Sequence, residues 1–262
     1  MRLLSALLLI ACAFGAQAAI QTREMPYQGA DGTRMVGYFA YDDSKPGIRP
    51  GVIVVHEWWG LNDYAKRRAR DLAGLGYSAL AIDMYGEGKH TGHPQDAMAF
   101  MQAATKDADA ARTRFLAGLE LLKRQPQTDP SQVAAIGYCF GGKIVLDMAR
   151  QGLPLAGVAS FPGALGPTTP ASKGSVRAKI RVEHGSADSM VPTKDLAALK
   201  QELSAAGADY QVVIQDGARH GFTNPDADAH QGHGLDIGYD RQADQRSWAD
   251  LQAFLEDIFK RG

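Results

Sequence analysis

Residues 133–142 read Val133-Ala134-Ala135-Ile136-Gly137-Tyr138-Cys139-Phe140-Gly141-Gly142, and this stretch decides the fold that the sequence predicts. Its apolar first half predicts a buried strand, and the residues from Lys143 to Ala149 predict a helix. A strand, a sharp turn and a helix with Gly-x-Cys-x-Gly at the turn make the pattern of a nucleophile elbow, with cysteine where serine is more common. The turn forces its central residue into a strained backbone conformation, and the flanking glycines supply the small neighbours that it requires.

Cys139 is the candidate nucleophile of this turn. We expect it at the mouth of the sheet, over a helix N-terminus whose partial positive charge favours a thiolate. The same pattern also fits a glycine-flanked strand–helix turn with a buried, unreactive cysteine, which is common in α/β proteins. The rest of the chain decides between these two interpretations.

The composition suits one globular domain, which we place at residues 19–262. The chain has 262 residues, of which 45% are hydrophobic and 22% are charged, and this balance is typical of a single domain of ordinary size. The 28 basic residues nearly cancel the 29 acidic ones, and no long run of one sign occurs. Nothing in this balance favours a nucleic-acid partner.

Residues 1–18 predict a secretory signal peptide. A positive start at Arg2 precedes an apolar run over residues 3–14, and Ala16-Gln17-Ala18 has the small-x-small pattern of a cleavage site. The apolar run is too short for a spanning helix. We expect cleavage after Ala18, with cleavage after Ala19 as the near alternative, and a mature protein that is periplasmic or secreted.

The cysteines depend on how this leader is processed. Residues 9–12 also resemble a bacterial lipobox, and in that alternative a lipidated Cys12 anchors the protein. If Cys12 leaves with the leader, Cys139 is the only thiol of the mature protein and has no intramolecular partner in an oxidising compartment. A lone cysteine there is either buried and inert or reactive, and the position of Cys139 in the elbow favours the second.

Strands and helices alternate along the chain. The strands are expected at Gln21–Tyr27, Arg34–Tyr41, Gly51–His56, Tyr77–Asp83, from Val133 to the elbow, and at Leu155–Phe161, Lys179–Gly185 and Tyr210–Ile214. The helices are expected at Asn62–Gly74, Gln95–Lys123 with a possible break near Thr105, Lys143–Ala149, from Thr193 as the cap to about Ala206, and at Tyr239–Lys260. This order predicts an α/β fold, a mostly parallel central sheet with helices on both faces. The strand Lys179–Gly185 alternates, so it should lie nearer an edge.

Two polar groups follow the ends of later strands, where chemistry gathers in such sheets. His184-Gly185-Ser186-Ala187-Asp188 ends one strand, and Gly217-Ala218-Arg219-His220-Gly221-Phe222 follows the next. The order Cys139, Asp188, His220 is the order nucleophile, acid, histidine of the α/β-hydrolases. His220 can take the thiol proton and later protonate the leaving group, while Asp188 holds its tautomer and stabilises the imidazolium. Each residue alone also fits a turn, a cap or a loop, but their alignment after successive strands favours a triad.

Four motifs together resemble the dienelactone hydrolase family. They are residues 137–142, His184-Gly185-x-x-Asp188, Arg219-His220-Gly221-Phe222, and His56-Glu57-Trp58-Trp59-Gly60-Leu61-Asn62 after the first buried strand. The likeness runs from about Glu24 to Phe259, nearly the whole mature chain. It implies the α/β-hydrolase fold.

The resemblance also implies roles around Cys139. In that family, the residue matching Glu57 interacts with the nucleophilic cysteine and takes part in its activation. The backbone N–H groups of the residues matching Phe140 and Trp58 form the oxyanion hole. An amide directly after the nucleophile points at the developing oxyanion, where one donor is worth about 3–4 kcal/mol.

The chain departs from the family where the substrate carboxylate is bound. Family members that open dienelactones hold that carboxylate with two arginines. One follows the Asp-x-Tyr motif, but here Asp83-Met84-Tyr85 is followed by Gly86, with Lys89 and His90 further on. The other lies four residues after the histidine, where this chain has Asn224. Lysine does not replace bidentate recognition, so the substrate is expected to differ from dienelactone. The candidate substrate-binding residues are Trp59, Tyr85, Lys89, Arg219 and Asn224.

The remaining aromatic and charged residues receive structural interpretations. Trp58 and Trp59 could line an apolar pocket, and at least one of them is expected in the core. The basic residues of the first helix are expected on a solvated face; they are Lys66, Arg67, Arg68 and Arg70. His56 and His184 end strands and are expected to make structural hydrogen bonds.

A metal site is not expected. The candidate ligands lie in one loop and are His220, His230 and His233 with Asp226 and Asp228. This loop lacks the i, i+4 spacing of a helical site and is crowded with glycine and proline.

We therefore predict an exported α/β-hydrolase without a cofactor, a carboxylesterase that cleaves a small ester or lactone through a thioester on Cys139. The expected partner is that small molecule, without nucleic acid or a membrane span, and the oligomeric state stays open. Two alternatives from other classes are a non-catalytic small-molecule binding protein on the same fold and a thiol redox sensor that uses Cys139. The presence of nucleophile, acid and base together favours the enzyme.

Overall fold

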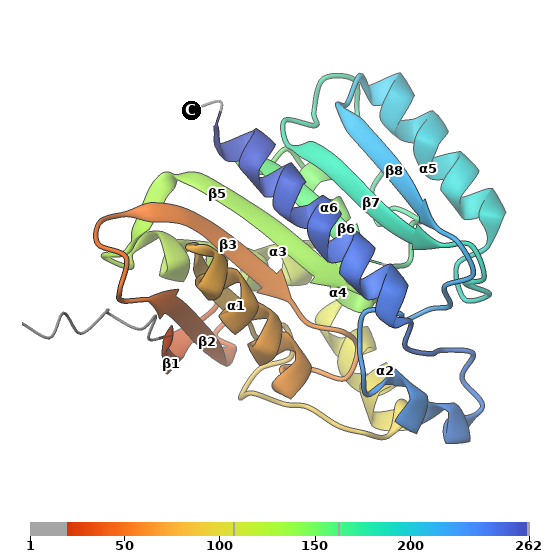
Figure 1. The fold of residues 1–262 in the computed structure, drawn as a ribbon, viewed down its shortest axis with the longest axis horizontal. Coiled ribbons are helices and arrows are strands. Elements are labelled where there is room, and N and C mark those ends of the chain that lie inside the picture. The colour runs from red at the N-terminus through yellow and green to blue at the C-terminus, as the bar shows by residue number, and fades with distance from the viewer. Residues whose placement is uncertain (1–19, 107, 162, 261–262) are drawn as a thin grey trace, which may run out of the picture.

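The computed structural model describes residues 20–106, 108–161 and 163–260, which form one central sheet between two layers of helices (Figure 1). The strands are β1 (Ile20–Gln28), β2 (Arg34–Asp42), β3 (Arg49–Val55), β4 (Ser78–Ile82), β5 (Thr128–Tyr138), β6 (Gly157–Phe161), β7 (Lys179–Gly185) and β8 (Tyr210–Gln215). Their order across the sheet is β1-β2-β4-β3-β5-β6-β7-β8. The pairs β1–β2 and β2–β4 are antiparallel, and every other neighbouring pair is parallel. The predicted mostly parallel sheet is therefore confirmed, and β7 lies next to the edge strand β8, as its alternation indicated.

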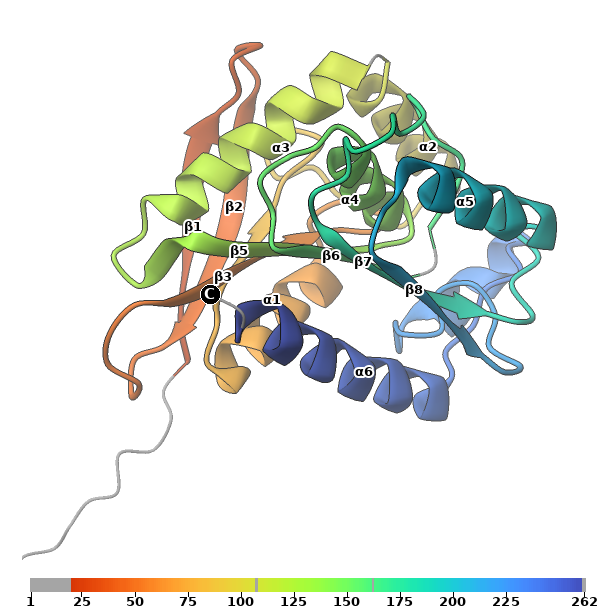
Figure 2. The same ribbon diagram turned by 90° about the horizontal axis from the view of Figure 1, so that it is seen from above.

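The helices cover both faces of this sheet (Figure 2). One face carries α1 (Asp63–Leu75) and α6 (Arg241–Phe259), and the other carries α2 (Pro94–Ala104), α3 (Ala108–Lys123), α4 (Phe140–Arg150) and α5 (Thr193–Ala206). Within the described residues 20–260, no helix combines the length and the apolar character that crossing a membrane requires.

The strand β3 shows why the sheet is buried on both sides. Val52 and Val54 belong to the cluster packed around α1 and α6, whereas Ile53 and Val55 belong to the cluster packed around α3 and α4. Successive side chains of a strand point to opposite faces, so a strand covered on both faces must be apolar at every position. This requirement explains the unbroken apolar run that predicted the strand.

Several element boundaries differ from the sequence prediction, whereas the break in the long helical stretch near Thr105 was expected. β5 begins at Thr128 rather than Val133. Thr128 and Asp129 pair with Arg49 and Pro50, the register then passes over residues 130–132 of β5, and pairing resumes with Val133 opposite Gly51. The polar, proline-containing start of β5 concealed this part of the strand in the sequence. The helical stretch from residue 95 does break near Thr105, and α2 and α3 are separate. Thr193 is the first residue of α5 and not its cap, since Pro192 occupies the cap position and no side chain caps the helix.

The carboxyl ends of the parallel strands place the chemically active residues on one edge of the sheet. Glu57 follows β3, Cys139 follows β5, Asp188 follows β7 and His220 follows β8. The predicted leader, including its cleavage site at Ala18, lies outside the described residues, as does the alternative lipid site. The described fold begins with β1 at Ile20.

Candidate active site

The turn between β5 and α4 has the backbone of a nucleophile elbow. Cys139 has φ 51° and ψ −114°, a backbone conformation that residues other than glycine rarely adopt. A Cβ on Gly137 would lie 2.0 Å from the carbonyl oxygen of Gly141, and a Cβ on Gly141 would lie 2.2 Å from the carbonyl oxygen of Val55. Both glycines are therefore sterically required, and the predicted elbow is confirmed as a backbone structure.

Asp188 fixes the orientation of His220. Its Oδ2 accepts a hydrogen bond from His220 Nδ1 at 3.0 Å, and its Oδ1 accepts from the backbone N–H groups of Met190 at 2.9 Å and Val191 at 3.1 Å. The other ring nitrogen, Nε2, is buried and has no hydrogen-bond partner among the described residues. The charge of Cys139 and a side-chain interaction with it nevertheless raise the pKa of the ring, so His220 binds Asp188 through Nδ1 and also lies close to Cys139.

Close approach of two loops brings Asp188 and His220 together. Ala187 N donates to Ala218 O at 3.0 Å, and a Cβ on Gly185 would lie 2.2 Å from the same oxygen. A glycine at the end of β7 therefore lets the loop after β7 touch the loop after β8. Because neighbouring parallel strands end side by side, this contact joins residues that are 32 positions apart.

The charge state of His220 follows from these neighbours. Burial by itself lowers the pKa of the imidazole, but the negative charge of Cys139 and the hydrogen bond and charge of Asp188 outweigh it. The net effect raises the pKa of His220 well above its usual value. The ring can therefore hold a proton beside Cys139, and a protonated imidazole next to the sulfur is the arrangement that activates cysteine nucleophiles.

Glu57 lies in the same site as a buried carboxyl. It is 5% exposed, and its Oε2 accepts a hydrogen bond from Asn224 Nδ2 at 2.7 Å. Burial raises the pKa of Glu57 to about 7, although the Asn224 hydrogen bond and the positive charges of His220 and Arg68 oppose the rise. The carboxyl is thus partly ionised near neutral pH, where it can both take and give a proton.

Two backbone N–H groups next to the candidate site residues, those of Trp58 and Phe140, have no partner among the described residues. Within the described residues, neither Trp58 N–H nor Phe140 N–H donates a hydrogen bond, and Phe140 is the first residue of α4. The Tyr85 hydroxyl donates to Trp58 O at 3.0 Å, which holds the Trp58 peptide in place. Both amides are therefore free to donate, and the oxyanion-hole role that the resemblance implied for them stays a prediction.

His56 has the structural role that the sequence indicated. Its Nε2 accepts from Met84 N at 3.2 Å, so the proton is on Nδ1, which donates to Glu57 O at 2.5 Å. Burial lowers the pKa of this histidine and keeps it neutral. Its ring lies 4.7 Å from the Tyr85 ring and 5.7 Å from the Phe140 ring, which supports the backbone on both sides of the oxyanion donors.

The cavity at Cys139 is small and contains no cationic side chain apart from His220. The described residues that line it are Glu57, Trp58, Trp59, Cys139, Met190, His220, Gly221, Asn224, Ala227 and Ile237. Its free space is about 20 Å³, roughly room for one water molecule. His230, in the 3₁₀ helix η1 (Ala227–His233), stacks on Trp59 with ring centroids 4.0 Å apart. A substrate must therefore displace side chains at this mouth.

Three of the predicted substrate-binding residues, Tyr85, Lys89 and Arg219, are not among the residues that line this cavity. Lys89 is exposed and pairs with Glu87 at 3.6 Å, and Tyr85 turns its hydroxyl to Trp58. Arg219 pairs with Asp236 at 3.7 Å on the surface. Trp59 and Asn224 do line the cavity, but the Asn224 amide is already bound to Glu57.

The prediction of a fully solvated basic face on α1 was wrong at Arg68. This side chain is 6% exposed and contacts Thr223, beside Asn224. Its position was visible in the helical spacing, because Tyr64 and Leu72, four residues before and after it, are buried too. The cluster of basic neighbours concealed that signal.

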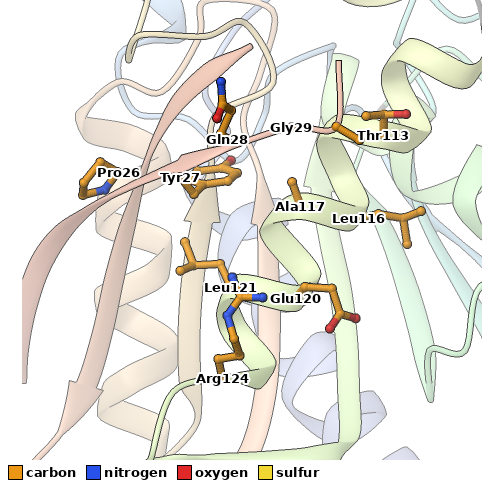
Figure 3. A pocket seen from close by; sticks show the side chains of 11 residues that line it. Pro26, Tyr27, Gln28, Gly29, Thr113, Leu116, Ala117, Glu120, Leu121 and Arg124 are labelled. Atoms are coloured by element: carbon orange, nitrogen blue, oxygen red, sulfur yellow. The ribbon is translucent and has the colours of Figure 1, made fainter. Parts of the chain in front are cut away.

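The structure also holds a larger hollow between β1 and α3 (Figure 3). Its volume is about 570 Å³, and it is lined by residues 26–30 of the strand end and by Thr113, Leu116, Ala117, Glu120, Leu121 and Arg124 of the helix. This lining includes no cysteine or histidine. Elsewhere in the described residues, no three histidine, cysteine, aspartate or glutamate side chains gather as a metal-binding group.

Comparison with known proteins identifies relatives of this chain. A model of the dienelactone hydrolase family matches residues 35–259. A protein of Aquifex aeolicus to which carboxymethylenebutenolidase activity is ascribed is 29% identical over 199 residues, which cover 74% of this chain and 84% of that protein. An uncharacterized protein of Caenorhabditis elegans is 33% identical over 150 residues, covering 56% and 94%.

Solved structures support the same conclusion about the fold. The crystal structure of a dienelactone hydrolase-like promiscuous phosphotriesterase from metagenomic libraries has a TM-score of 0.86 at 37% identity, covering 92% of this chain and 99% of that one. The crystal structure of a Klebsiella pneumoniae protein to which dienelactone hydrolase activity is ascribed has a TM-score of 0.76 at 21% identity. It covers 90% of this chain and 98% of that one, which is a likeness of fold. The predicted α/β-hydrolase fold is confirmed.

Proposed function

Because the chain belongs to the dienelactone hydrolase family and is an ester or lactone hydrolase of that type, we propose that Cys139 is its nucleophile and that it acts on small neutral substrates. The observation that carries this proposal is the strained elbow that presents Cys139 beside the oriented His220–Asp188 pair. Nucleophile, base and orienting acid are the three parts that covalent hydrolysis requires.

In the first half of the reaction, the Cys139 thiolate attacks the carbonyl carbon of the substrate. The new carbon–sulfur bond pushes the carbonyl π electrons onto oxygen, and the N–H groups of Trp58 and Phe140 stabilise that oxyanion. When the oxyanion collapses, the carbon–oxygen bond to the alcohol breaks. The departing alkoxide takes the proton of the His220 imidazolium, and a thioester remains on Cys139.

In the second half, His220 is neutral and acts as the base. Its Nε2 takes a proton from a water molecule, whose oxygen attacks the thioester carbon. The carbon–sulfur bond breaks, the acid leaves, and the thiolate faces a protonated His220 again. This cycle regenerates the thiolate with its imidazolium, so Glu57 acts only where Cys139 starts as a neutral thiol. Its ionised carboxylate, whose pKa burial raises to about 7, then takes the thiol proton and forms the thiolate that attacks.

The test is to trap the thioester. Mixing the protein with a neutral p-nitrophenyl ester and quenching in acid should give an acyl adduct on Cys139, seen by peptide mass spectrometry and removed by hydroxylamine. The matched control is Cys139→Ala, which should give neither adduct nor turnover. Turnover by this variant would reject Cys139 as the nucleophile. Ligand binding without turnover by the wild type would favour the binding protein, and reversible oxidation of Cys139 without turnover would favour the redox sensor.

A free carboxylate next to the scissile bond should lower kcat/KM for a substrate. Among the described residues that line the cavity there is no arginine or lysine, so a buried substrate anion has no guanidinium partner. We expect kcat/KM for a neutral ester to exceed that of its carboxylate-bearing counterpart by about tenfold or more, or 1.4 kcal/mol. The two esters should be compared at moderate and at high salt. A preference for the carboxylate at both would contradict the prediction and indicate that Arg219 or Lys89 reaches the cavity.

Phosphotriesters are a second class of electrophile to assay. The crystallised relative that is 37% identical is described as a promiscuous phosphotriesterase. We propose that the same thiolate in this chain can attack a neutral phosphotriester, because such a compound also lacks the negative charge that the cavity cannot pair. Loss of this turnover in Cys139→Ala would assign both activities to one site.

Export is part of the proposal and concerns the leader alone. It is supported by the pattern of residues 1–18, which combine a positive start, an apolar run and a small-x-small cleavage site. Expression of the full chain in a bacterium should yield a periplasmic or secreted protein whose N-terminus is Ala19 or Ile20 by intact-mass measurement. A lipid adduct on Cys12 would contradict this expectation in favour of the anchored form.

A further inference from the structure

Arg68 is a buried cation that the mechanism above does not use. It lies on α1, is 5% exposed, and its guanidinium carbon lies over the rings of Tyr64, Tyr138 and Trp248 at 5.3, 5.6 and 4.9 Å. Burying a guanidinium removes its hydration, so it needs partners of opposite charge or polarity inside the protein. Those partners connect it to the proposed active site.

The guanidinium binds the loop that carries His220. Nη2 donates to the carbonyl oxygen of Thr223 at 2.9 Å and also contacts the carboxylate of Asp244 on α6. The Tyr64 hydroxyl, which accepts from Arg68 Nε at 3.3 Å, bonds the Thr223 hydroxyl at 2.7 Å. The Thr223 backbone and side chain are therefore both held from α1.

Thr223 directly precedes the residue that holds Glu57. Asn224 Nδ2 donates to Glu57 Oε2 at 2.7 Å, and Thr223 and Asn224 are each 2% exposed. We propose that Arg68 is a positioning residue for the reaction. By fixing the Thr223 carbonyl, it fixes the position of the neighbouring Asn224 amide and therefore of Glu57, and it anchors the loop that carries His220. This inference rests on the proposed function, because it assumes that Glu57 and His220 act on Cys139.

The positive charge of Arg68 also acts on Glu57, by favouring its ionised form. The groups that face Glu57 are Arg68 and Tyr64 from α1, His220 and Asn224 from the loop after β8, and Asp226 beyond that loop. Burial raises the pKa of Glu57 to about 7, the Asn224 hydrogen bond and the charges of His220 and Arg68 lower it, and Asp226 raises it. Loss of Arg68 removes one cation and loosens one hydrogen bond, so the pKa of Glu57 should rise further. The ionised carboxylate would then form only at higher pH.

The experiment compares Arg68→Met and Arg68→Lys with a matched control, Arg150→Met. Arg150 on α4 is 3% exposed, pairs with Asp147 and Glu202 at 3.0 Å, and donates to Leu165 O at 2.7 Å. It thus has the same kind of partners but none in the cavity at Cys139. Thermal unfolding and the pH profiles of kcat and kcat/KM for a neutral chromogenic ester are measured for each folded variant.

Both methionine variants should unfold at lower temperature than the wild type. Only Arg68→Met should also lower kcat, by about tenfold or more with KM changed less than about threefold, because it misplaces reacting groups without touching substrate. The acidic limb of the pH profile of Arg68→Met should move to higher pH by roughly half a unit or more, because the pKa of Glu57 rises. Arg68→Lys keeps the charge but not the fork, so its limb should lie near that of the wild type while kcat stays low.

Several outcomes would overturn the inference. It fails if Arg68→Met matches the wild type in kcat and limb position, or if Arg150→Met shifts the limb equally. If Arg68→Met does not fold, Arg68→Lys decides, and a wild-type kcat there rejects the role. Failure of the proposed function looks different, because Cys139→Ala would then keep its activity whatever the Arg68 variants do.

Discussion

Replacing Cys139 or His220 with alanine lowers kcat/KM for a neutral ester by roughly 10³-fold or more, and replacing both lowers it little further. The two residues share each chemical step in the proposed mechanism, since His220 returns the proton that the leaving alcohol needs and then activates water. Once either group is missing, the other has no step left to assist. The measurement is steady-state kinetics of the two single variants and the double variant at matched folded concentration.

A third variant, at the orienting carboxylate of Asp188, accompanies the two single variants and the double variant. Asp188 accepts hydrogen bonds from His220 and from two backbone N–H groups, so Asp188→Asn keeps most of the shape but presents an amide to the ring. This variant should lose activity strongly as well, by up to about 10⁴-fold, because the imidazole loses its favoured tautomer. Losses that multiply in the double variant would show that Cys139 and His220 act in separate steps.

Replacing Gly141 with alanine should prevent the native elbow from forming. The new Cβ would lie 2.2 Å from Val55 O and 2.8 Å from His56 O, both backbone atoms that cannot rotate away. Either α4 moves off β3 or the chain does not fold. We expect a loss of about 3 kcal/mol or more in the free energy of unfolding, at or beyond the upper end of ordinary overpacking, together with loss of esterase activity.

Gly74→Ala is the matched control for this prediction. Gly74 lies in α1, and no atom lies within 4 Å of the Cβ that alanine would add. Because alanine favours a helix over glycine, this variant should be more stable by about 0.5–1 kcal/mol and keep full activity. Thermal and urea unfolding of both variants check the pair. A folded, active Gly141→Ala protein would show that the elbow tolerates a side chain.

Short-range sterics and the periodicity of apolar residues allowed the elbow, the buried strands and the order of the candidate site residues to be predicted from the sequence. The elbow could be predicted because its tight turn leaves no room for a side chain at Gly137 or Gly141, and this steric requirement is visible in the local sequence. The buried strand β3 could be predicted because both of its faces are covered and every position must be apolar. The order Cys139, Asp188, His220 predicted that these three residues lie together, because parallel strands bring their carboxyl ends to one edge of the sheet.

Charges that find partners far along the chain were decided only by the tertiary structure. Arg68 sits among basic neighbours that indicated a solvated face, yet its partners Thr223 and Asp244 lie 155 and 176 positions away. No local pattern reveals them, because they come from α6 and the loop after β8. Likewise, Asn224 was expected to meet substrate, whereas packing sets its amide against Glu57, 167 positions away. A polar side chain's local sequence fixes its chemistry, but which group it meets depends on how distant elements pack.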